Sequence, residues 1–86
     1  MVVIKVVFFA SVRERLGVEE ERVEIPAEVK NVAQLKAFLA QRGGKWAEVM
    51  EADQKLLASV NQEMASEEYT IQLGDEVAFF PPVTGG

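Results

Sequence analysis

One segment of the chain has a clear helical repeat, and strand-like runs flank it on both sides. Asn31 is a favourable N-cap residue, and the side chain of Gln34 can reach back to the helix start. The apolar residues that recur at helical spacing are Val32, Leu35, Phe38 and Leu39. Gly43 and Gly44 favour a helix end. We therefore predict one main helix between Asn31 and Gly43, with an apolar stripe that packs on a sheet.

The N-terminal run from Val2 to Ala10 is rich in β-branched and aromatic residues, which predicts the first strand. Successive side chains of a strand point to opposite faces of the sheet. One face carries Ile4, Val6 and Phe8, and the other carries Val3, Lys5, Val7 and Phe9. Because Lys5 is charged, we expect the second face to be the outer one, away from the main helix.

Shorter elements are predicted on both sides of the main helix. Ser11 to Leu16 is expected to form one or two helical turns, with Ser11 as N-cap and Gly17 as the end. Arg22 to Ile25 alternates polar and apolar residues, which predicts a second strand that stops at Pro26. After the main helix we predict a short helix that buries Trp46, Val49 and Met50, and then a third strand at Leu56 to Met64. Three further pieces follow: an extended piece at Tyr69 to Leu73, a turn at Leu73 to Glu76 and a last strand at Val77 to Phe80.

This order of elements predicts an α+β domain of the ubiquitin-like β-grasp type, in which a mixed sheet packs on one main helix. The chain has 86 residues, which is enough for one domain. We assign residues 1–80 to this domain and residues 81–86 to a flexible, extended tail that carries two glycines.

Charge and composition exclude several classes of function. The net charge is −5 and the nine basic residues are scattered, so we expect no nucleic acid partner. The absence of His and Cys excludes disulfides, catalysis by a Ser-His-Asp triad or a Cys-His pair, and the usual ligands of soft metals, and we predict no metal site. No apolar run approaches the ~20 residues of a membrane span, and Val2 to Ala10 lacks the basic leader of a signal peptide. We therefore expect a cytoplasmic protein without a membrane partner.

The last predicted strand adds an aromatic residue to the outer face of the sheet. Phe79 and Phe80 point to opposite faces, so one of them joins Val7 and Phe9 on the outer side. A sheet covered by a helix on one side is normally polar on the other. The excess of apolar residues predicts a surface for a protein partner, unless a loop or the second helix covers it.

The segment PPVTGG follows the last strand directly. Pro81 and Pro82 have no N–H to donate, so they end the sheet ladder and stiffen the exit of the chain. Gly85 and Gly86 lack a Cβ and can enter a narrow channel. Terminal glycines are otherwise typical of a frayed end or a cloning remnant. The prolines and the apolar strand before them favour a working tail, whose reactive group is the α-carboxylate of Gly86.

A carboxylate that is ionised at neutral pH is a poor electrophile. Activation with ATP would convert it into an acyl-adenylate, whose carbonyl a nucleophile can attack. An amine would then give a conjugated protein, and a sulfur donor would give a thiocarboxylate. Because the chain has no Cys, the sulfur would have to come from another protein.

Three stretches of the chain resemble the small, sulfur-carrier subunit of molybdopterin synthase: FFASVRERLG at 8–17, LLASVNQE at 56–63 and GDEVAFFPPVTGG at 74–86. The resemblance extends over the whole chain and is loosest between Gly17 and Lys30. The tail is its most specific part, because the segment FFPPVT precedes the two glycines.

The resemblance implies a β-grasp fold and a role in molybdenum cofactor biosynthesis. An adenylating enzyme of the ubiquitin-activating type would use ATP and magnesium to adenylate Gly86, and a persulfide sulfur donor would supply the sulfur of a thiocarboxylate. The large catalytic subunit would accept the tail, within a heterotetramer of two small and two large subunits. There the sulfur would pass to cyclic pyranopterin monophosphate to form molybdopterin. The chain itself would bind no cofactor and would be a non-catalytic, sulfur-donating subunit.

The resemblance also assigns roles to individual residues. Gly86 would carry the sulfur, and Gly85 would permit threading of the tail. The rest of the inserted tail would be Pro81, Pro82, Val83 and Thr84. Docking on the large subunit would involve Phe9, Met64 and Phe80.

Three alternatives stay open from the sequence. The chain could be a sulfur carrier of the same fold for thiamine synthesis or tRNA thiolation, a ubiquitin-like modifier that is joined to lysines, or a binding module whose tail has no function. The segment FFPPVT favours the molybdopterin pathway over the first alternative, and a co-purified partner would decide between them.

Overall fold

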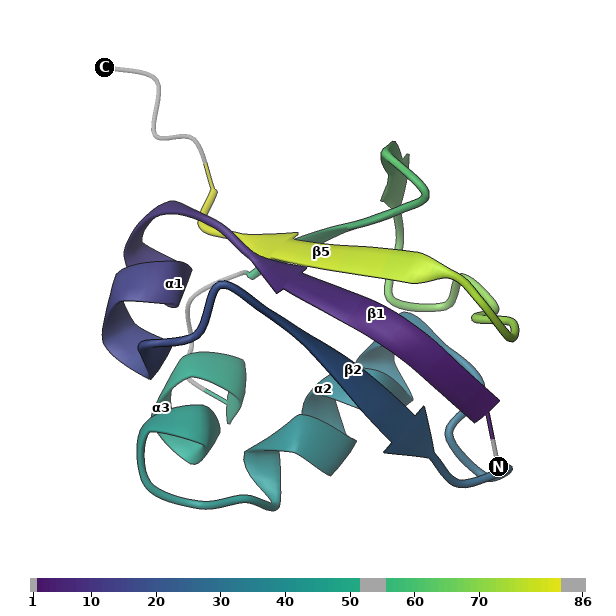
Figure 1. Ribbon diagram of the computed structural model, residues 1–86, viewed down its shortest axis with the longest axis horizontal. Helices are drawn as coiled ribbons and strands as arrows, with labels where there is room; N and C mark the ends of the chain where they lie inside the picture. Colours follow the sequence, from purple (N-terminus) through teal and green to yellow (C-terminus); the bar gives the residue numbers. More distant parts are fainter. Residues whose placement is uncertain (1, 52–55, 83–86) are drawn as a thin grey trace.

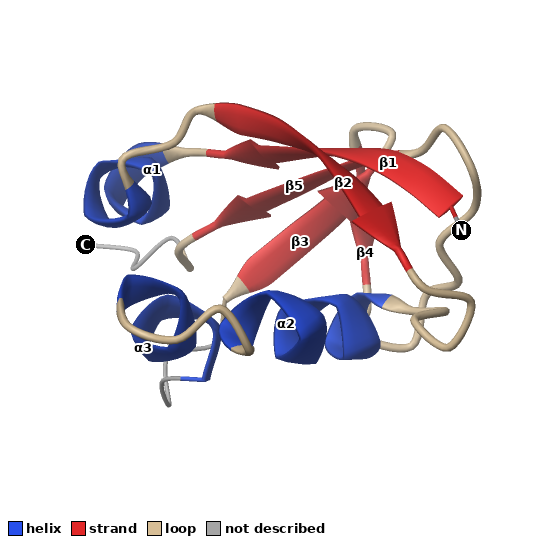
Figure 2. Ribbon diagram, turned by 60° about the horizontal axis from the view of Figure 1, so that its bottom comes forward, coloured by secondary structure: helices blue, strands red, loops and turns tan. Residues whose placement is uncertain are grey.

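The computed structural model describes residues 2–51 and 56–82 of the chain. Helices α2 and α3 lie against one face of a five-stranded sheet, and α1 lies at one end of it (Figures 1 and 2). In chain order the elements are β1 (Val2–Phe8), α1 (Ala10–Leu16), β2 (Glu20–Ile25), α2 (Val32–Ala40), α3 (Lys45–Glu51), β3 (Leu57–Val60), β4 (Glu63–Ala65) and β5 (Glu76–Phe80). None of the helices in these ranges has the length and hydrophobicity that a bilayer crossing requires.

The sheet is mixed, with the strand order β2-β1-β5-β3-β4. The two central strands, β1 and β5, run parallel, whereas every other neighbouring pair is antiparallel. The antiparallel pair of β1 and β2, the helix α2 on the sheet and the return of β5 beside β1 make a β-grasp fold. The α+β class and the mixed sheet on one main helix are therefore confirmed.

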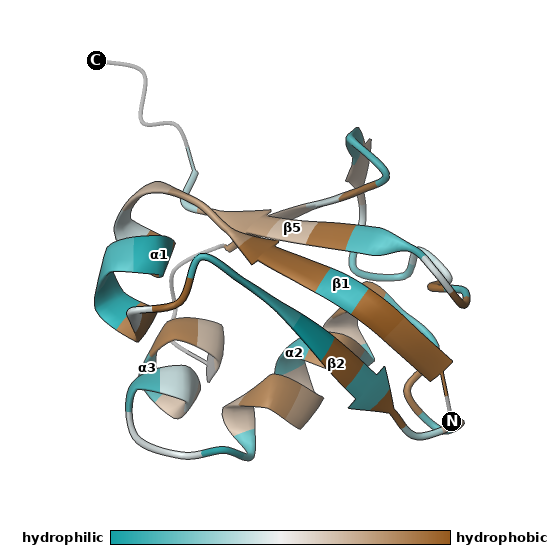
Figure 3. Cartoon of the chain, in the orientation of Figure 1, coloured by the Kyte–Doolittle hydropathy of each residue, from teal (hydrophilic) through white to brown (hydrophobic). Residues whose placement is uncertain are grey.

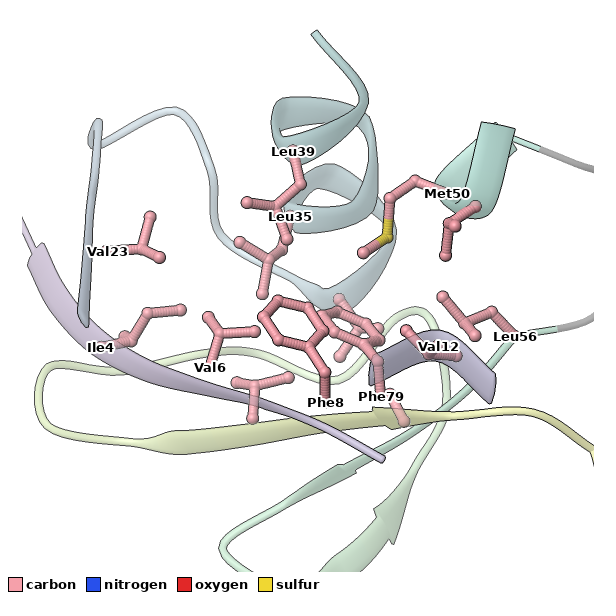
Figure 4. Packing of buried hydrophobic residues seen from close by; sticks show 14 of the residues in the cluster. Ile4, Val6, Phe8, Val12, Val23, Leu35, Leu39, Met50, Leu56 and Phe79 are labelled. Atoms are coloured by element: carbon pink, nitrogen blue, oxygen red, sulfur yellow. The ribbon is translucent and has the colours of Figure 1, made fainter. Parts of the chain in front are cut away.

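The core lies between the sheet and the helices. Figure 4 shows the rings of Phe8 and Phe79 side by side beneath Leu35 and Leu39 of α2. The two rings stack with centroids 6.3 Å apart, and Trp46 meets Phe8 edge-on at 5.5 Å. The face predicted for the core is confirmed, because Ile4, Val6 and Phe8 are at most 1% exposed.

The N-terminus of α2 confirms the predicted cap at Asn31, with one difference. The Gln34 N–H donates to the Asn31 side-chain oxygen at 2.8 Å. The Gln34 side chain accepts from the Lys30 N–H at 2.7 Å, one residue before the position of a capping box. Of the predicted stripe, Phe38 is only partly buried, because it lies at the margin of the helix face that meets the sheet.

The predicted cap of α1 is wrong. The helix begins at Ala10, Phe9 occupies the cap position, and no side chain caps it. Ala10, with a φ of 52°, already belongs to the helix, so Ser11 lies inside the first turn and is not the cap residue. Gly17 does end the helix as predicted, in a left-handed conformation with its N–H donating to the Arg13 carbonyl at 2.8 Å.

The region predicted as a single strand, Leu56 to Met64, is a hairpin of β3 and β4. Asn61 and Gln62 have φ values of 51° and 71°, which is the backbone of a tight two-residue turn. This turn explains why the apolar alternation of the segment is imperfect. The predicted extended piece at Tyr69 to Leu73 contributes an isolated bridge from Thr70 to Asn31 and no named strand.

An ion pair joins β2 to the end of α2. The Arg42 guanidinium donates two hydrogen bonds to the Glu21 carboxylate, at 3.0 and 2.6 Å, and stacks over the Trp46 ring at 4.4 Å. These hydrogen bonds lower the pKa of Glu21, and they outweigh the opposite effect of its partial burial. The pair therefore stabilises the folded state most when Glu21 is ionised.

We predict that Phe79 and Phe80 differ sharply in their contribution to stability. Phe79 is 0% exposed, so Phe79→Ala should lower the free energy of unfolding by about 3–5 kcal/mol. Phe80 is half-buried on the other face, so Phe80→Ala should cost less than about 2 kcal/mol. Urea unfolding followed by circular dichroism measures both, and equal losses would contradict the assigned faces.

We predict that Glu21→Gln destabilises the protein in a pH-dependent way. The folded-state pKa of Glu21 is lowered, so its stabilising effect is full above the ordinary carboxyl pKa of about 4.3 and is lost as the pH falls below it. At neutral pH the loss should be about 0.5 kcal/mol, since both partners are partly exposed to solvent. Urea unfolding of both proteins at several pH values measures this difference, and Glu28→Gln is the control. A difference that grows towards acid pH would refute the role of the pair.

Candidate functional site

The helix-free face of the sheet carries a group of apolar side chains near the end of β5. Cross-strand pairing sets this group, because Phe80 lies opposite Leu57, while Ser59 lies opposite both Ala78 and Met64. Val7 of β1 lies opposite Ala78. We call this group the outer patch, and its members are Val7, Phe9, Leu57, Met64, Ala78 and Phe80. Figure 3 shows the hydrophobic residues along β1 and β5 that border it.

Phe9 joins the outer patch by continuing β1 for one residue. Its backbone is extended, with φ −123° and ψ 157°, and its N–H donates to the Phe79 carbonyl at 3.1 Å. Because side chains alternate along extended backbone, Phe9 points to the face opposite Phe8. Ala10 then turns the chain into α1 in a left-handed conformation that a non-glycine residue rarely adopts.

The outer patch has exposed apolar members around a buried centre. Met64 is 65% exposed and Phe9 is 48% exposed. Phe80 and Leu57 are half-buried, and Val7 and Ala78 are buried between them. The structure thus brings Phe9, Met64 and Phe80 to one face of the sheet, from three different strands or strand ends. Their role in docking stays a prediction.

Leu57 was missed by the sequence analysis. It lies directly opposite Phe80, and so it belongs to the outer patch as closely as Met64 does. The turn at Asn61 and Gln62 was the available signal, because a two-residue turn fixes which residues of β3 and β4 share a face. Without the turn, the long single strand left Leu57 without a neighbour.

The tail leaves the sheet from the outer patch. Pro81 and Pro82 follow Phe80 without a break, and Pro81 is half-buried whereas Pro82 is exposed. The other tail residues with predicted roles, Val83, Thr84, Gly85 and Gly86, lie outside the described residues. The division of the chain at residue 80 therefore stays a prediction.

The described residues around the outer patch are mainly apolar. No polar or charged side chain is buried among residues 2–50 and 56–82. No three potential metal ligands come together there either. The charges that border the outer patch are exposed, as in the ion pair of Lys5 with Glu20 at 3.3 Å. Such a surface can hold a protein partner by apolar contact.

Known proteins share both the sequence and the fold of this chain. The ThiS family matches residues 6–86. The molybdopterin synthase sulfur carrier subunit of Escherichia coli K12 is 48% identical over 83 residues, which cover 96% of this chain and 99% of that protein. The corresponding subunit of Haemophilus influenzae is 41% identical over the same shares of the two chains.

Two solved structures have the same fold. A putative molybdopterin converting factor, subunit 1, from Pyrococcus furiosus is 29% identical with a TM-score of 0.77, over 96% of this chain and all of that one. A protein–protein complex of subunits 1 and 2 of the molybdopterin-converting factor from Helicobacter pylori contains a chain with a TM-score of 0.64 at 20% identity, over 98% of this chain and 99% of that one. The family match and the 48% identity to a full-length relative agree. This chain belongs to the ThiS family and, within it, to the molybdopterin synthase sulfur carrier subunits.

Proposed function

We propose that this chain is the sulfur carrier subunit of a molybdopterin synthase, and that Gly86 carries the sulfur as a thiocarboxylate. One structural observation supports it above all others. Phe80 is at once a member of the outer patch and the last residue of β5, directly before Pro81 and Pro82. A partner that docks on the outer patch therefore receives the start of the tail at the edge of the interface.

The reach of the tail suits this arrangement. Pro81 and Pro82 cannot pair with a neighbouring strand and favour extended backbone, so the chain is directed away from the sheet. Val83 to Gly86 can extend by roughly 13 Å. Two residues without a side chain at the tip allow the carbonyl of Gly86 to enter a narrow site on the partner.

The chemistry begins with activation of the Gly86 carboxylate by a separate adenylating enzyme. The carboxylate attacks the α-phosphate of ATP, pyrophosphate leaves, and an acyl-adenylate forms. A persulfide sulfur then attacks the carbonyl and AMP leaves. Cleavage of the remaining S–S bond by a thiol releases the thiocarboxylate and leaves the donor as a disulfide. ATP and magnesium act in the activating enzyme, and this chain supplies only the carbonyl.

The acceptor is a large catalytic subunit that docks on the outer patch. The thiocarboxylate sulfur attacks a side-chain carbon of the pterin substrate, cyclic pyranopterin monophosphate, and a C–O bond at that carbon breaks as the C–S bond forms. Water then hydrolyses the acyl–sulfur bond, which leaves the sulfur on the pterin and returns the Gly86 carboxylate. Two such transfers build the dithiolene of molybdopterin, and two small subunits serve a dimer of large ones. Catalytic groups come from the large subunit, in agreement with a chain that has no His or Cys. The Helicobacter pylori relative, solved as a complex of subunits 1 and 2, supports this choice of partner.

We predict that the protein gains the mass of one oxygen-to-sulfur exchange when it is incubated with ATP, its activating enzyme and a persulfide donor. Deletion of Gly86 should abolish this gain and the formation of molybdopterin, while the fold and the affinity for the large subunit stay nearly unchanged. Intact-mass spectrometry and a molybdopterin assay measure the two effects. Sulfur transfer by the shortened chain would refute the carrier role, and an isopeptide-linked adduct in its place would identify a protein modifier.

We predict that Phe80→Asp weakens the complex with the large subunit at least about tenfold, because docking would bury an unpaired carboxylate. Leu73→Asp is the matched control, since Leu73 is 72% exposed and precedes β5 at the opposite end of that strand. Isothermal titration calorimetry with each variant measures both affinities. An unchanged affinity for Phe80→Asp, or an equal loss for Leu73→Asp, would exclude the outer patch as the docking surface.

A further inference from the structure

A second surface of the chain lies on the opposite side of the sheet, between β2 and α2. Two cavities of about 310 and 320 Å³ open there. The first is lined by residues 21–24 of β2 and by Phe38, Gln41 and Arg42. The second continues past Phe38 and Gln41 to Pro26, Val29 and Ala37. Because Phe38 and Gln41 line both cavities, the two cavities lie side by side along the edge of the sheet, and we call them together the β2–α2 groove.

The outer edge of β2 is open for a further strand. β2 is the first strand in the sheet order, and its only neighbour among the described strands is β1. The Phe8 N–H donates to the Glu19 carbonyl at 2.9 Å, and bonded positions alternate along an antiparallel pair. Glu21 and Val23 therefore also turn their backbone groups towards β1. Arg22 and Glu24 turn theirs away from β1, along the open edge.

One added strand can pair with the open edge and fill the groove at the same time. A strand that pairs with the backbone of Arg22 and Glu24 would lie along β2 with alternate side chains pointing to the helix side. A side chain opposite Val23 would enter the groove beside Phe38, which is only partly buried by the core of the protein. The Glu21–Arg42 ion pair lies at one end of the same groove. An apolar side chain in the groove would cover the exposed part of Phe38.

The charges on the outer face of β2 specify what the added strand should carry. Arg22 and Glu24 are both exposed, and neither forms an ion pair within the described part of the chain. An added antiparallel strand runs opposite to β2, so along its own sequence it meets Glu24 before Arg22. Its residue opposite Glu24 should be basic, and its residue opposite Arg22, two positions later, should be acidic. The residue between them faces the groove and should be apolar.

Pairing with the β2 strand of a second copy of this chain would match the charges of Arg22 and Glu24 but would not fill the groove. Two β2 strands paired about Val23 would place Arg22 opposite Glu24. The helix-side residues of that second copy are already engaged, however, because Val23 and Ile25 are 4% and 1% exposed in their own core. Glu21 is bound to Arg42 of its own chain. In such a β2–β2 pair, these described helix-side residues of the second copy are not free to enter the groove, whereas an extended peptide has side chains that are.

We propose that the β2–α2 groove binds an extended peptide segment of another protein, which adds a strand to β2. The segment has the pattern basic–apolar–acidic, and its apolar residue enters the groove beside Phe38. This surface lies on the helix side and at the β2 edge of the sheet, whereas the outer patch lies on the helix-free face. The chain can therefore hold this peptide while a large subunit occupies the outer patch.

The test is an NMR titration of the full-length chain with the capped peptide TVKIETT, up to about 1 mM. The lysine, isoleucine and glutamate of this peptide supply the basic–apolar–acidic pattern. The amide signals of Arg22, Glu24 and Phe38 should shift in a saturable way. The peptide TVKSETT, which lacks the apolar anchor, should bind at least about fivefold more weakly, since a buried isoleucine contributes more than that factor.

Two pairs of variants separate strand addition from a general effect of charge. Arg22→Pro removes an N–H of the open edge, where proline is tolerated, and should weaken binding roughly tenfold relative to Arg22→Gln, which removes only the charge. Ala37→Trp fills the groove from the exposed face of α2 and should weaken binding with β2 intact. Phe80→Asp, on the other face, should leave the affinity for the peptide unchanged.

Three results would overturn the proposal. The first is the absence of shifts at Arg22 and Glu24, or shifts confined to the outer patch. The second is equal binding by Arg22→Pro and Arg22→Gln in samples whose spectra show that both are folded. The third is a concentration-dependent dimer of the free chain that protects the β2 amides, since a second copy would then be the occupant of the edge. None of these results depends on whether Gly86 carries sulfur.

Discussion

The parallel pairing of β1 with β5 is the interaction on which the rest of the structure depends. It places the first and last strands of the chain side by side at the centre of the sheet, with Phe8 opposite Phe79. Both rings are then buried in one core, beneath α2 (Figure 4). A shift of one residue in this register would turn Phe79 outward and bring Phe80 into the core. The core holds the register, because the same shift would also expose Val77, which is 0% exposed, and turn Glu76 and Ala78 inward.

The same register builds the outer patch, which we propose as the docking surface. Once Phe8 and Phe79 point to the core, Phe9 and Phe80 must point away from it, because side chains alternate along each strand. The β3–β4 hairpin then adds Leu57 and Met64 on the same face. The docking surface of the proposed carrier is thus the reverse side of its own core. Pro81 and Pro82 follow at the end of β5, so the residues that stabilise the fold also set where the tail departs.

The two edge strands of the sheet, β4 and β2, differ in length and in charge. β4 is short and carries Met64 towards the outer patch, whereas β2 is longer and carries alternating charges. Charged residues on an edge strand oppose uncontrolled pairing with other chains. They also specify which strand can pair, because a complementary order of charges is required. In β2 this order of charges lies beside the groove that Phe38 lines, and on the proposed peptide binding the two together select the added strand.

Most elements of the fold follow from local sequence signals. The helix α2 with its cap at Asn31, the strands β1, β2 and β5, and the end of α1 at Gly17 were all predictable, because capping, periodicity and glycine conformation act within a few residues. The β3–β4 hairpin and the cap of α1 were not. The turn at Asn61 and Gln62 lacks the glycine that normally marks such turns, and the start of α1 depends on where the β1–β5 ladder ends.

The sequence by itself predicts the chemistry proposed for Gly86, because a tail of two prolines and two glycines directly after an apolar strand favours a working tail and resembles that of the sulfur carrier subunits. It also determined that Phe79 and Phe80 face opposite ways. Only the tertiary structure decided which of the two is exposed, since this depends on pairing with residues that lie some 70 positions away in the chain. The same holds for the outer patch and for the β2–α2 groove. Each is formed by segments that are far apart in the sequence and lie side by side only in the folded protein.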